Sequence, residues 1–326
     1  MIPSFAFVRP HTLEEAVNRL AAGGARLHGG GTDLLGCLRD GVFTADAVVS
    51  LSALDRLSGI SVTRDGSVRI GALTTVSEVA ADPRVADHYP AVLAEAAASV
   101  ASPQLRNQGT IGGNLCQKPR CWYYRGDFHC LRKGGDMCYA FAGENQYHCI
   151  FGGDMCYIVH PSDTAPALAA LGAVCRVTGP SGSRSVAVEK LHVPPSEDPT
   201  RETVLADDEI LTEVVVPPAP PGLRSSYRKV RTRASWDFAV VGLALALAFD
   251  GDRIREASVF LSGVAPVPWR SRPLEEAVIG KTLNGATISA AAKAAVAGAE
   301  PLSKNGYKIP LLEGLVTEQL ERLRQA

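Results

Sequence analysis

Six of the chain's eight cysteines lie within residues 116–156. In a reducing compartment such a cluster binds metal or carries redox chemistry more often than it forms structural disulfides. The gaps between the cysteines are irregular and contain no CxxC, whereas zinc ribbons and fingers use short paired spacings. An iron–sulfur cluster needs four thiolates and accepts them from longer loops, so it is the favoured prediction. Zinc and buried, reduced thiols are the alternatives. The six residues are Cys116, Cys121, Cys130, Cys138, Cys149 and Cys156.

The residues between these cysteines suit an iron–sulfur site. Two glycine pairs, Gly134-Gly135 and Gly152-Gly153, offer backbone N–H groups for hydrogen bonds to cluster sulfides. Aromatic side chains exclude water from such a site and thereby influence its reduction potential. The aromatic residues in the first part of the segment are Trp122, Tyr123, Tyr124 and Phe128.

A run of three glycines, Gly29–Gly31, precedes Thr32 and Asp33. Successive glycines let the backbone present several N–H groups with no Cβ in the way, which suits an anion such as a pyrophosphate. The two commonest phosphate motifs do not fit. No GxGxxG follows a strand, and the Walker-like span from Gly31 continues with Cys37 where a lysine is required. The alternative is a tight turn in which Asp33 caps a short helix.

A second glycine-rich segment runs from Asn107 to Leu115. One glycine turn is weak evidence, because chain reversals in general favour glycine. Two such turns in one domain suit a dinucleotide, which must be held at several points. Downstream of the cysteines, Ser162 and Asp163 are positioned to cap a helix over residues 164–171. Asp163 therefore has two interpretations, a helix cap or a carboxylate that accepts hydrogen bonds from a ribose.

The composition limits the class of protein. A chain of 326 residues predicts two or three domains, and 46% hydrophobic with 21% charged residues is typical of a globular protein. A net charge of −1 without a charged tail argues against nucleic acid or a membrane surface as partner. The first residues do not resemble a signal peptide, and the longest apolar stretch, residues 239–249, is too short for a membrane span. We therefore expect a cytoplasmic protein.

The elements that position these segments follow from periodicity and turn signals. Antiparallel hairpins and helices in separate blocks predict an α+β fold. The stretch Pro217–Gly222 is typical of a stiff, exposed linker. Helices are expected over residues 12–23, 75–81, 90–100, 164–171, 287–299 and 312–324. Hairpins are expected over residues 60–70, 174–188 and 239–261, and a further strand over 210–216.

Three segments together resemble a known family. At this spacing they are similar to the FAD-binding medium subunit of the molybdenum hydroxylases, the group of xanthine dehydrogenase and carbon monoxide dehydrogenase, over essentially the full length. The cysteine segment also resembles the insertion of the 4-hydroxybenzoyl-CoA reductase β subunit, which carries a 4Fe–4S cluster. The three segments are Gly29-Gly-Gly-Thr-Asp33, Gly109-Thr-Ile-Gly-Gly-Asn114 and Pro161-Ser-Asp163.

The resemblance implies a fold in two parts. Residues 1–217 would form an FAD-binding domain of the vanillyl-alcohol-oxidase (PCMH) type, built from two α+β subdomains. Residues 116–156 would be an iron–sulfur insertion in that domain. Residues 222–326 would form a smaller α+β domain, like the C-terminal domain of carbon monoxide dehydrogenase flavoproteins.

The resemblance also implies the residues that contact FAD. The first glycine loop would wrap the pyrophosphate, and the second would contact phosphate and flavin. Asp163 matches an aspartate near the adenosine ribose, while Leu211 and Lys229 match positions that approach the flavin. The first loop comprises Leu27, His28, Gly29, Gly30, Gly31, Thr32, Asp33 and Leu34, and the second comprises Thr110, Ile111, Gly112, Gly113 and Asn114.

The resemblance to the reductase subunit implies four cluster ligands. Cys116 directly follows the second glycine segment and Cys149 lies in a loop of different length, so both are expected to be spare. Cys156 is preferred over Cys149 because of its distance to Asp163. The implied ligands of the 4Fe–4S cluster are Cys121, Cys130, Cys138 and Cys156.

The function that the resemblance implies is electron transfer. Substrate chemistry would occur at a molybdenum cofactor in a large partner subunit and reach FAD through 2Fe–2S clusters in a small one. The 4Fe–4S cluster would exchange electrons with an external carrier, a ferredoxin or NAD. The substrate would be aromatic, heterocyclic or an acyl-CoA, and no residue of this chain is expected to be catalytic. The alternatives are a stand-alone flavoprotein oxidoreductase and a zinc-stabilised, non-redox assembly subunit.

Overall fold

The N-terminal part is a small parallel sheet with two helices. The computed structural model describes residues 2–89 and 91–325. The strand order is β1-β3-β2, and β3 pairs in parallel with both neighbours. The helix α1 begins with the capping box expected at Thr12 and Glu15. The elements are β1 (Ala6–Val8), α1 (Leu13–Ala21), β2 (Ala25–His28), α2 (Leu34–Arg39) and β3 (Ala47–Ser50).

This parallel sheet was not among the strands predicted from the sequence, which were mostly antiparallel hairpins. Strands β1 and β2 are joined by α1, and β2 and β3 by α2, so each connection crosses over the sheet. Strands of three or four residues carry too little period-2 pattern to be recognised from the sequence.

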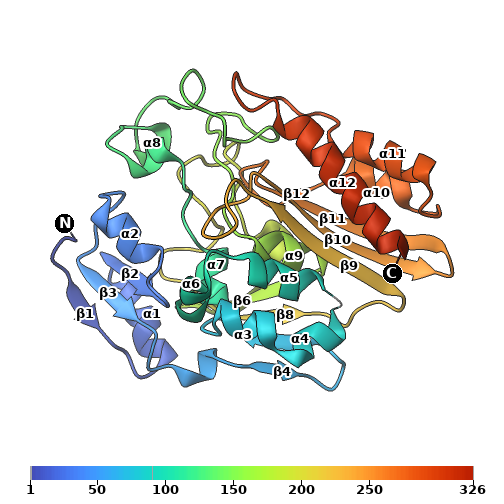
Figure 1. Ribbon diagram of the computed structural model, residues 1–326. Helices are drawn as coiled ribbons and strands as arrows, with labels where there is room; N and C mark the ends of the chain where they lie inside the picture. Colours follow the sequence, from blue (N-terminus) through green and yellow to red (C-terminus); the bar gives the residue numbers. More distant parts are fainter. Residues whose placement is uncertain (1, 90, 326) are drawn as a thin grey trace.

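A five-stranded antiparallel sheet follows, with the strand order β4-β5-β8-β6-β7. The hairpins predicted around Asp65-Gly66 and at 174–188 are confirmed, and β8 has the bounds expected for the strand at 210–216. One face carries a group of short helices (Figure 1). The strands are β4 (Ile60–Val62), β5 (Val68–Gly71), β6 (Val174–Gly179), β7 (Gly182–Ala187) and β8 (Ile210–Val216). The helices are α3 (Val76–Ala81), α4 (Pro83–His88), α5 (Val92–Ser99), α6 (Pro103–Gln108), α7 (Ile111–Leu115) and α9 (Thr164–Ala170), with 3-10 turns η1 (Asp55–Leu57) and η3 (Val188–Lys190).

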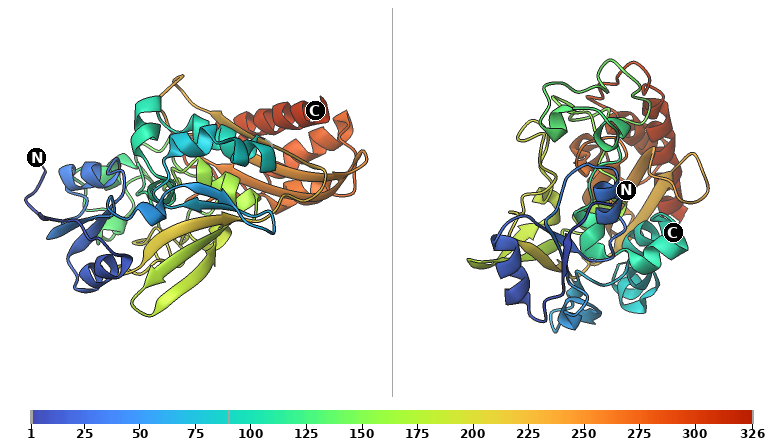
Figure 2. Two further views of the ribbon diagram at one scale, coloured as in Figure 1. Left: turned by 90° about the horizontal axis from the view of Figure 1, so that it is seen from below. Right: turned by 90° about the vertical axis from the view of Figure 1, so that its left-hand side faces the viewer.

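The C-terminal part is a four-stranded antiparallel sheet covered by three helices, at the end of the molecule away from β1 (Figures 1 and 2). The hairpin expected at Asp250-Gly251 joins β10 and β11. The last two helices were predicted at 287–299 and 312–324; α11 ends earlier and α12 starts earlier, and α10 was not predicted. The elements are β9 (Leu223–Val230), β10 (Val241–Asp250), β11 (Arg253–Ser262), β12 (Trp269–Arg270), α10 (Arg272–Val278), α11 (Gly285–Ala295) and α12 (Lys308–Gln325).

Strand β10 is shared between two hydrophobic cores. Its alternation is as predicted, but both faces are buried. Ala244 and Ala246 belong to the core of the central domain, together with residues of α5 and α9. Leu243 and Leu245 belong to the core under α10, α11 and α12. The two domains are therefore packed against opposite faces of one sheet.

The cysteine segment forms loops that bridge these domains. Within residues 116–156 the regular elements are α8 (Trp122–Arg125) and the 3-10 turn η2 (Leu131–Lys133). The second half of the segment packs on the C-terminal domain: Ile150 and Phe151 belong to its core, and Phe151 stacks on Trp269 at a centroid distance of 5.3 Å. In Figure 1 the segment lies above α6 and α7 and beside α12.

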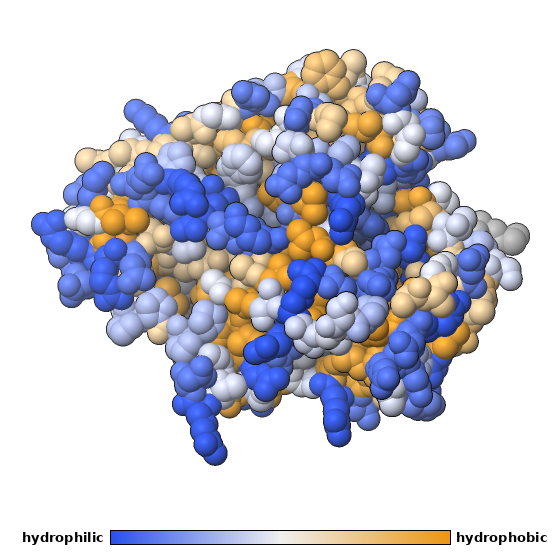
Figure 3. Space-filling model, turned by 180° about the vertical axis from the view of Figure 1, so that it is seen from behind, coloured by the Kyte–Doolittle hydropathy of each residue, from blue (hydrophilic) through white to orange (hydrophobic). Residues whose placement is uncertain are grey.

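The surface is of mixed character. On the face shown in Figure 3, hydrophobic residues form patches that hydrophilic residues separate. Within residues 2–89 and 91–325, no helix combines the length and the apolar character that a bilayer crossing requires.

Candidate functional site

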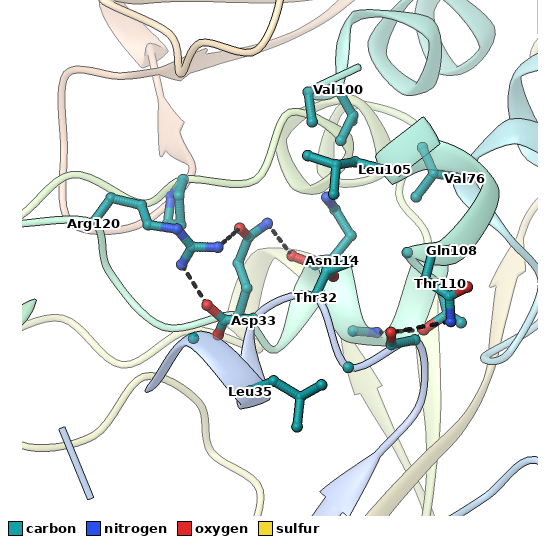
Figure 4. A pocket seen from close by; sticks show the side chains of 18 of the residues that line it. Thr32, Asp33, Leu35, Val76, Val100, Leu105, Gln108, Thr110, Asn114 and Arg120 are labelled. Carbon is teal, nitrogen blue, oxygen red and sulfur yellow. Dashed lines mark hydrogen bonds and ion pairs between the residues drawn. The ribbon is translucent and has the colours of Figure 1, made fainter. Parts of the chain in front are cut away.

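A cleft of about 810 Å³ opens between the glycine loop after β2 and the helices α6 and α7. A smaller cavity of about 260 Å³ lies on the other side of the same loop. Two further segments complete the wall of the cleft. They are the loop between β9 and β10, which contains Asp237, and the residues directly before α9. Figure 4 shows Asp33 pointing toward Arg120, with Val76, Val100 and Leu105 on another wall.

The structure brings together fifteen of the sixteen residues predicted to contact FAD. Leu27, Gly29, Leu34, Gly112 and Leu211 line the smaller cavity. The exception is Ile111, which is buried in the central core and whose N–H donates to the Thr74 carbonyl at 2.9 Å. The residues that line the cleft are His28, Gly30, Gly31, Thr32, Asp33, Thr110, Gly113, Asn114, Asp163 and Lys229.

Glycine is required at two positions of the first loop. A Cβ on Gly30 would lie 1.9 Å from the carbonyl oxygen of Gln108, so only glycine lets the two loops approach this closely. Gly31 has a φ of +74°, in the left-handed region. Among the described residues, no acceptor receives the N–H groups of Gly30, Gly31 or Thr32. These donors are available to an anion in the cleft.

The second glycine segment is a short helix, α7, and this corrects the prediction of a turn. Thr110 caps it by accepting a hydrogen bond from the Gly113 N–H at 3.1 Å. The Asn114 side-chain oxygen accepts hydrogen bonds from Ser162 at 2.5 Å and Thr164 at 2.7 Å. Because its oxygen is held in this way, the Asn114 amide nitrogen is free to donate toward the cleft.

Asp33 does not cap α2 with its side chain, so the helix-cap interpretation is wrong. Its carboxylate accepts a hydrogen bond from the Lys118 N–H at 2.8 Å. It also lies 2.7 Å from the guanidinium groups of both Arg120 and Arg125. The glycine loop is thus tied to the start of the cysteine segment. The two arginines also offset the charge of Asp33, which lowers its repulsion of a phosphate.

Asp163 is a buried anchor between the two domains, and its interpretation as a helix cap is also wrong. Ser162 caps α9 instead, because its hydroxyl accepts from the Ala165 N–H at 3.0 Å. The Asp163 carboxylate accepts hydrogen bonds from Tyr227 at 2.8 Å and Lys229 at 2.7 Å, both on β9. Burial raises the pKa of Asp163, and the Lys229 ammonium opposes this shift.

The four predicted cluster ligands, Cys121, Cys130, Cys138 and Cys156, line one small cavity of about 10 Å³. Cys116, predicted to be spare, lines the cavity beside the glycine loop instead. A hydrogen bond from the Cys156 thiol to Cys138 lowers the pKa of Cys138 and raises that of Cys156. Within the described residues, no group of three or more His, Cys, Asp and Glu side chains is arranged to hold a single metal ion.

The walls of this cavity differ in part from the prediction. Tyr123 and Tyr124 line it as expected, but Trp122 does not and Phe128 is 41% exposed. The N–H groups of the first glycine pair are already used: Gly134 donates to the Leu131 carbonyl and Gly135 to the Cys130 carbonyl, each at 3.0 Å. The expectation that this pair donates to cluster sulfides is therefore wrong.

A buried arginine that the sequence did not single out forms another part of the wall. Arg132 lies 3.0 Å from Glu202 and donates to the carbonyls of Pro199 and Arg201, each at 2.6 Å. Glu202 also pairs with Lys118. This network fixes the cysteine segment to the loop before β8.

A third cavity, of about 380 Å³, lies between the cysteine cavity and the cleft. It shares Cys121 and His148 with the cysteine cavity. It shares Arg120, Asp237 and Phe238 with the cleft. The two predicted cofactor sites therefore adjoin the same intervening cavity, one through Arg120 and the other through Cys121.

Comparison with known proteins agrees with this architecture. Residues 3–219 match the model of the FAD binding domain in molybdopterin dehydrogenase, and residues 225–323 match the CO dehydrogenase flavoprotein C-terminal domain. The chain is 36% identical to the aldehyde oxidoreductase FAD-binding subunit PaoB of Escherichia coli over 98% of both proteins. It is 28% identical to the carbon monoxide dehydrogenase medium chain of Hydrogenophaga pseudoflava, over 92% of this chain and 88% of the relative.

Solved structures share the fold. Carbon monoxide dehydrogenase from Hydrogenophaga pseudoflava aligns with a TM-score of 0.75 and 26% identity over 99% of this chain and 96% of that one. Quinoline 2-oxidoreductase from Pseudomonas putida 86 aligns with a TM-score of 0.78 over 100% and 98% of the two chains; at 24% identity it supports the fold alone.

The fold and the cleft define a two-domain flavoprotein of the PCMH type, as predicted. More particularly, the chain belongs to the family of FAD-binding medium subunits of the molybdenum hydroxylases, which includes subunits of carbon monoxide dehydrogenase, xanthine dehydrogenase and aldehyde oxidoreductase.

Proposed function

We propose that this chain is an electron-transfer subunit that carries FAD and a 4Fe–4S cluster in a molybdenum-dependent oxidoreductase. The observation that carries the proposal is the meeting of Cys121, Cys130, Cys138 and Cys156 at one cavity, which shares an adjoining cavity with the cleft. FAD exchanges electrons singly or in pairs, so it links two-electron substrate chemistry to one-electron carriers.

The cleft has the donors that FAD requires. The free N–H groups at Gly30, Gly31 and Thr32 suit a pyrophosphate. The buried Asp163 carboxylate, which lines the cleft, has acceptor capacity left for a ribose hydroxyl after its bonds to Tyr227 and Lys229.

The cysteine donor set suits a cluster better than a single ion. A zinc ion draws all its thiolates to about 2.3 Å from one point, whereas a 4Fe–4S cluster places each thiolate on a different iron. The cavity of about 10 Å³ means that the four thiols must stand further apart when they hold a cluster. Apart from α8 and η2, the segment consists of loops, so this separation breaks few helix or strand hydrogen bonds.

The partners of the proposed complex are a molybdopterin-binding large subunit and a 2Fe–2S small subunit. The relatives named above are subunits or medium chains of larger enzymes, which supports this part of the proposal. In the proposed complex the large subunit, and not this chain, selects the substrate. Aromatic, heterocyclic and acyl-CoA compounds are candidate substrates. Aldehydes are the first class to test, because one relative belongs to an aldehyde oxidoreductase. A ferredoxin or NAD as external carrier and a cytoplasmic location complete the proposal.

The test is the cofactor content of the chain purified without oxygen. The proposal requires about one FAD and about four irons with acid-labile sulfide per chain. A yellow protein without iron supports the stand-alone flavoprotein alternative. A colourless protein that contains zinc supports the assembly-subunit alternative, and either result overturns the proposal.

Single replacements by serine test the ligand set. Cys130→Ser and Cys138→Ser are expected to lose most of the iron and to keep FAD, because the two sites are built from different residues. Cys116→Ser and Cys149→Ser are the matched controls from the same segment, and both are expected to retain iron. Iron lost from Cys149→Ser but kept in Cys156→Ser would show that the assignment of the fourth ligand is wrong.

A further inference from the structure

We propose that His148 is a positioning residue for the cluster: its Nε2–H donates a hydrogen bond to the Cys121 sulfur and thereby raises the reduction potential of the cluster. This inference rests on the proposed function, since it presumes that Cys121 is a cluster ligand. The Nε2 atom lies 3.3 Å from the Cys121 Sγ atom. His148 is 3% exposed, so this hydrogen bond is sheltered from water.

Ligation of Cys121 decides the direction of this hydrogen bond. A thiolate bound to iron carries no proton, so the proton between the two atoms must belong to the imidazole. A neutral imidazole with its proton on Nε2 has an unprotonated Nδ1. The Nδ1 atom of His148 is buried and has no hydrogen-bond partner among the described residues, so no acceptor there favours a proton on Nδ1 over one on Nε2.

A ring contact and backbone hydrogen bonds position His148. Its imidazole makes a T-shaped contact with Trp122 at a centroid distance of 5.4 Å. The backbone carbonyl of His148 accepts hydrogen bonds from Lys308 at 2.9 Å and Asn305 at 3.1 Å. The backbone N–H of His148 donates to the Asn145 carbonyl at 3.0 Å. Lys308 and Asn305 belong to the C-terminal domain, so this domain sets the position of a ring that contacts the proposed cluster.

The energetic consequence follows from charge. Each electron added to a cluster increases the negative charge on its thiolates, and a hydrogen bond to a charged acceptor strengthens with that charge. The donor therefore stabilises the reduced form more than the oxidised form, and outer hydrogen bonds of this kind tune metal sites. His148 also lines the cavity between the cysteine cavity and the cleft, which places the donor on the flavin side of the cluster.

The experiment compares the reduction potential of the cluster in the wild type, His148→Phe and His148→Gln by redox titration with EPR detection. Phenylalanine keeps a ring against Trp122 and removes the donor, whereas glutamine retains an N–H. We expect the ratio of reduced to oxidised cluster at a fixed ambient potential to fall about tenfold in His148→Phe, a shift of about 59 mV for one electron. The reduction potential of the cluster in His148→Gln is expected to lie between the potentials in His148→Phe and the wild type.

The control is His129→Phe, the same replacement at an exposed histidine of the same segment. It is expected to leave the potential unchanged. A cluster in His148→Phe with the wild-type potential overturns the inference while leaving the proposed function intact. A wild-type protein without iron overturns the proposed function itself, so the two failures are distinguishable.

A second measurement, which does not need His148→Phe, covers the case in which that variant fails to assemble a cluster. Pulsed EPR of the reduced protein labelled with ¹⁵N-histidine is expected to show one weakly coupled histidine nitrogen. This coupling should be absent from His148→Gln and present in His129→Phe. A reduced cluster without any histidine coupling in the wild type overturns the inference.

Discussion

The carboxylate of Asp33 lies 2.7 Å from the guanidinium of Arg120, which joins the glycine loop of the cleft to the residue directly before Cys121. Arg125, in α8, pairs with the same carboxylate oxygen. Asp33 belongs to the predicted FAD site, and Arg120 directly precedes Cys121, a predicted cluster ligand. The glycine loop and the first cysteine of the cavity are therefore positioned by one ion-pair network.

The first prediction concerns Asp33→Ala. This replacement leaves Arg120 and Arg125 without their carboxylate, and both side chains are largely buried. We expect the free energy of unfolding to fall by about 2 kcal/mol and both FAD and iron contents to decrease. Urea denaturation and cofactor analysis measure these effects. If iron were lost while FAD affinity stayed at the wild-type value, the proposed coupling of the two sites would be wrong.

The second prediction concerns Gly30→Ala. The added Cβ would lie 1.9 Å from the Gln108 carbonyl oxygen, so the glycine loop must move away from α6. We expect FAD affinity to fall by about tenfold or more, equivalent to about 1.4 kcal/mol, with iron content unchanged. Fluorescence titration with FAD measures the affinity. Gly285→Ala, where the new Cβ meets no atom within 4 Å, is the control and should bind FAD like the wild type.

The third prediction concerns Lys308, a fully buried lysine of α12. Its ammonium donates to the carbonyls of Tyr147, His148 and Gly263 at 3.0, 2.9 and 2.6 Å. Lys308→Met removes these donors, and we expect the free energy of unfolding to fall by about 3 kcal/mol. Lys304→Met, in the same region but exposed and paired with the exposed Glu144, should change it by less than about 0.5 kcal/mol. Equal effects of the two replacements would show that the hydrogen bonds of Lys308 to these carbonyls do not stabilise the fold.

The fourth prediction concerns pH. Burial lowers the pKa of His192 to about 4, while an unfolded histidine has a pKa of about 6.5. Below pH 6.5 this histidine binds a proton in the unfolded chain but not in the folded chain. Its contribution to the free energy of unfolding is therefore complete above pH 6.5 and is lost as the pH falls toward 4. Between pH 7 and 5 this histidine should account for a loss of about 2 kcal/mol.

The variant His192→Gln isolates this contribution. Its amide retains a donor for the Leu115 carbonyl, which His192 contacts at 3.0 Å, but it does not titrate. The difference in unfolding free energy between pH 7 and pH 5 should shrink by about 2 kcal/mol in this variant. An unchanged pH dependence would show that protonation of His192 is not coupled to unfolding.

The parts of the fold that could be predicted are those with local signals. The Thr12 capping box, the Asp65-Gly66 turn and the alternation of β10 each depend on residues within one element. The parallel sheet was missed because its strands are short and their pairing is set by distant segments. The start of α12 was placed a few residues too late because Lys308, a polar residue, is buried there by tertiary contacts.

The site, too, contains residues that could be predicted from the sequence and residues whose roles depend on distant contacts. The two glycine segments and the grouping of Cys121 with Cys156 were predicted through a family resemblance that spacing alone did not establish. Arg120 and Tyr227 were missed, because their roles arise from contacts with Asp33 and Asp163 that lie far away in sequence. No local pattern marks a charged or phenolic residue whose partner is on another domain.

We propose that this one chain holds FAD and a 4Fe–4S cluster close enough to exchange electrons. The most direct test mixes the anaerobic chain rapidly with less reductant than both cofactors require. Flavin absorbance and the EPR signal of the cluster are then followed at several protein concentrations. If the two cofactors share one chain, both signals should approach equilibrium with one rate constant that does not depend on protein concentration. A rate that rises in proportion to protein concentration, or a chain that lacks one of the two signals, would contradict it.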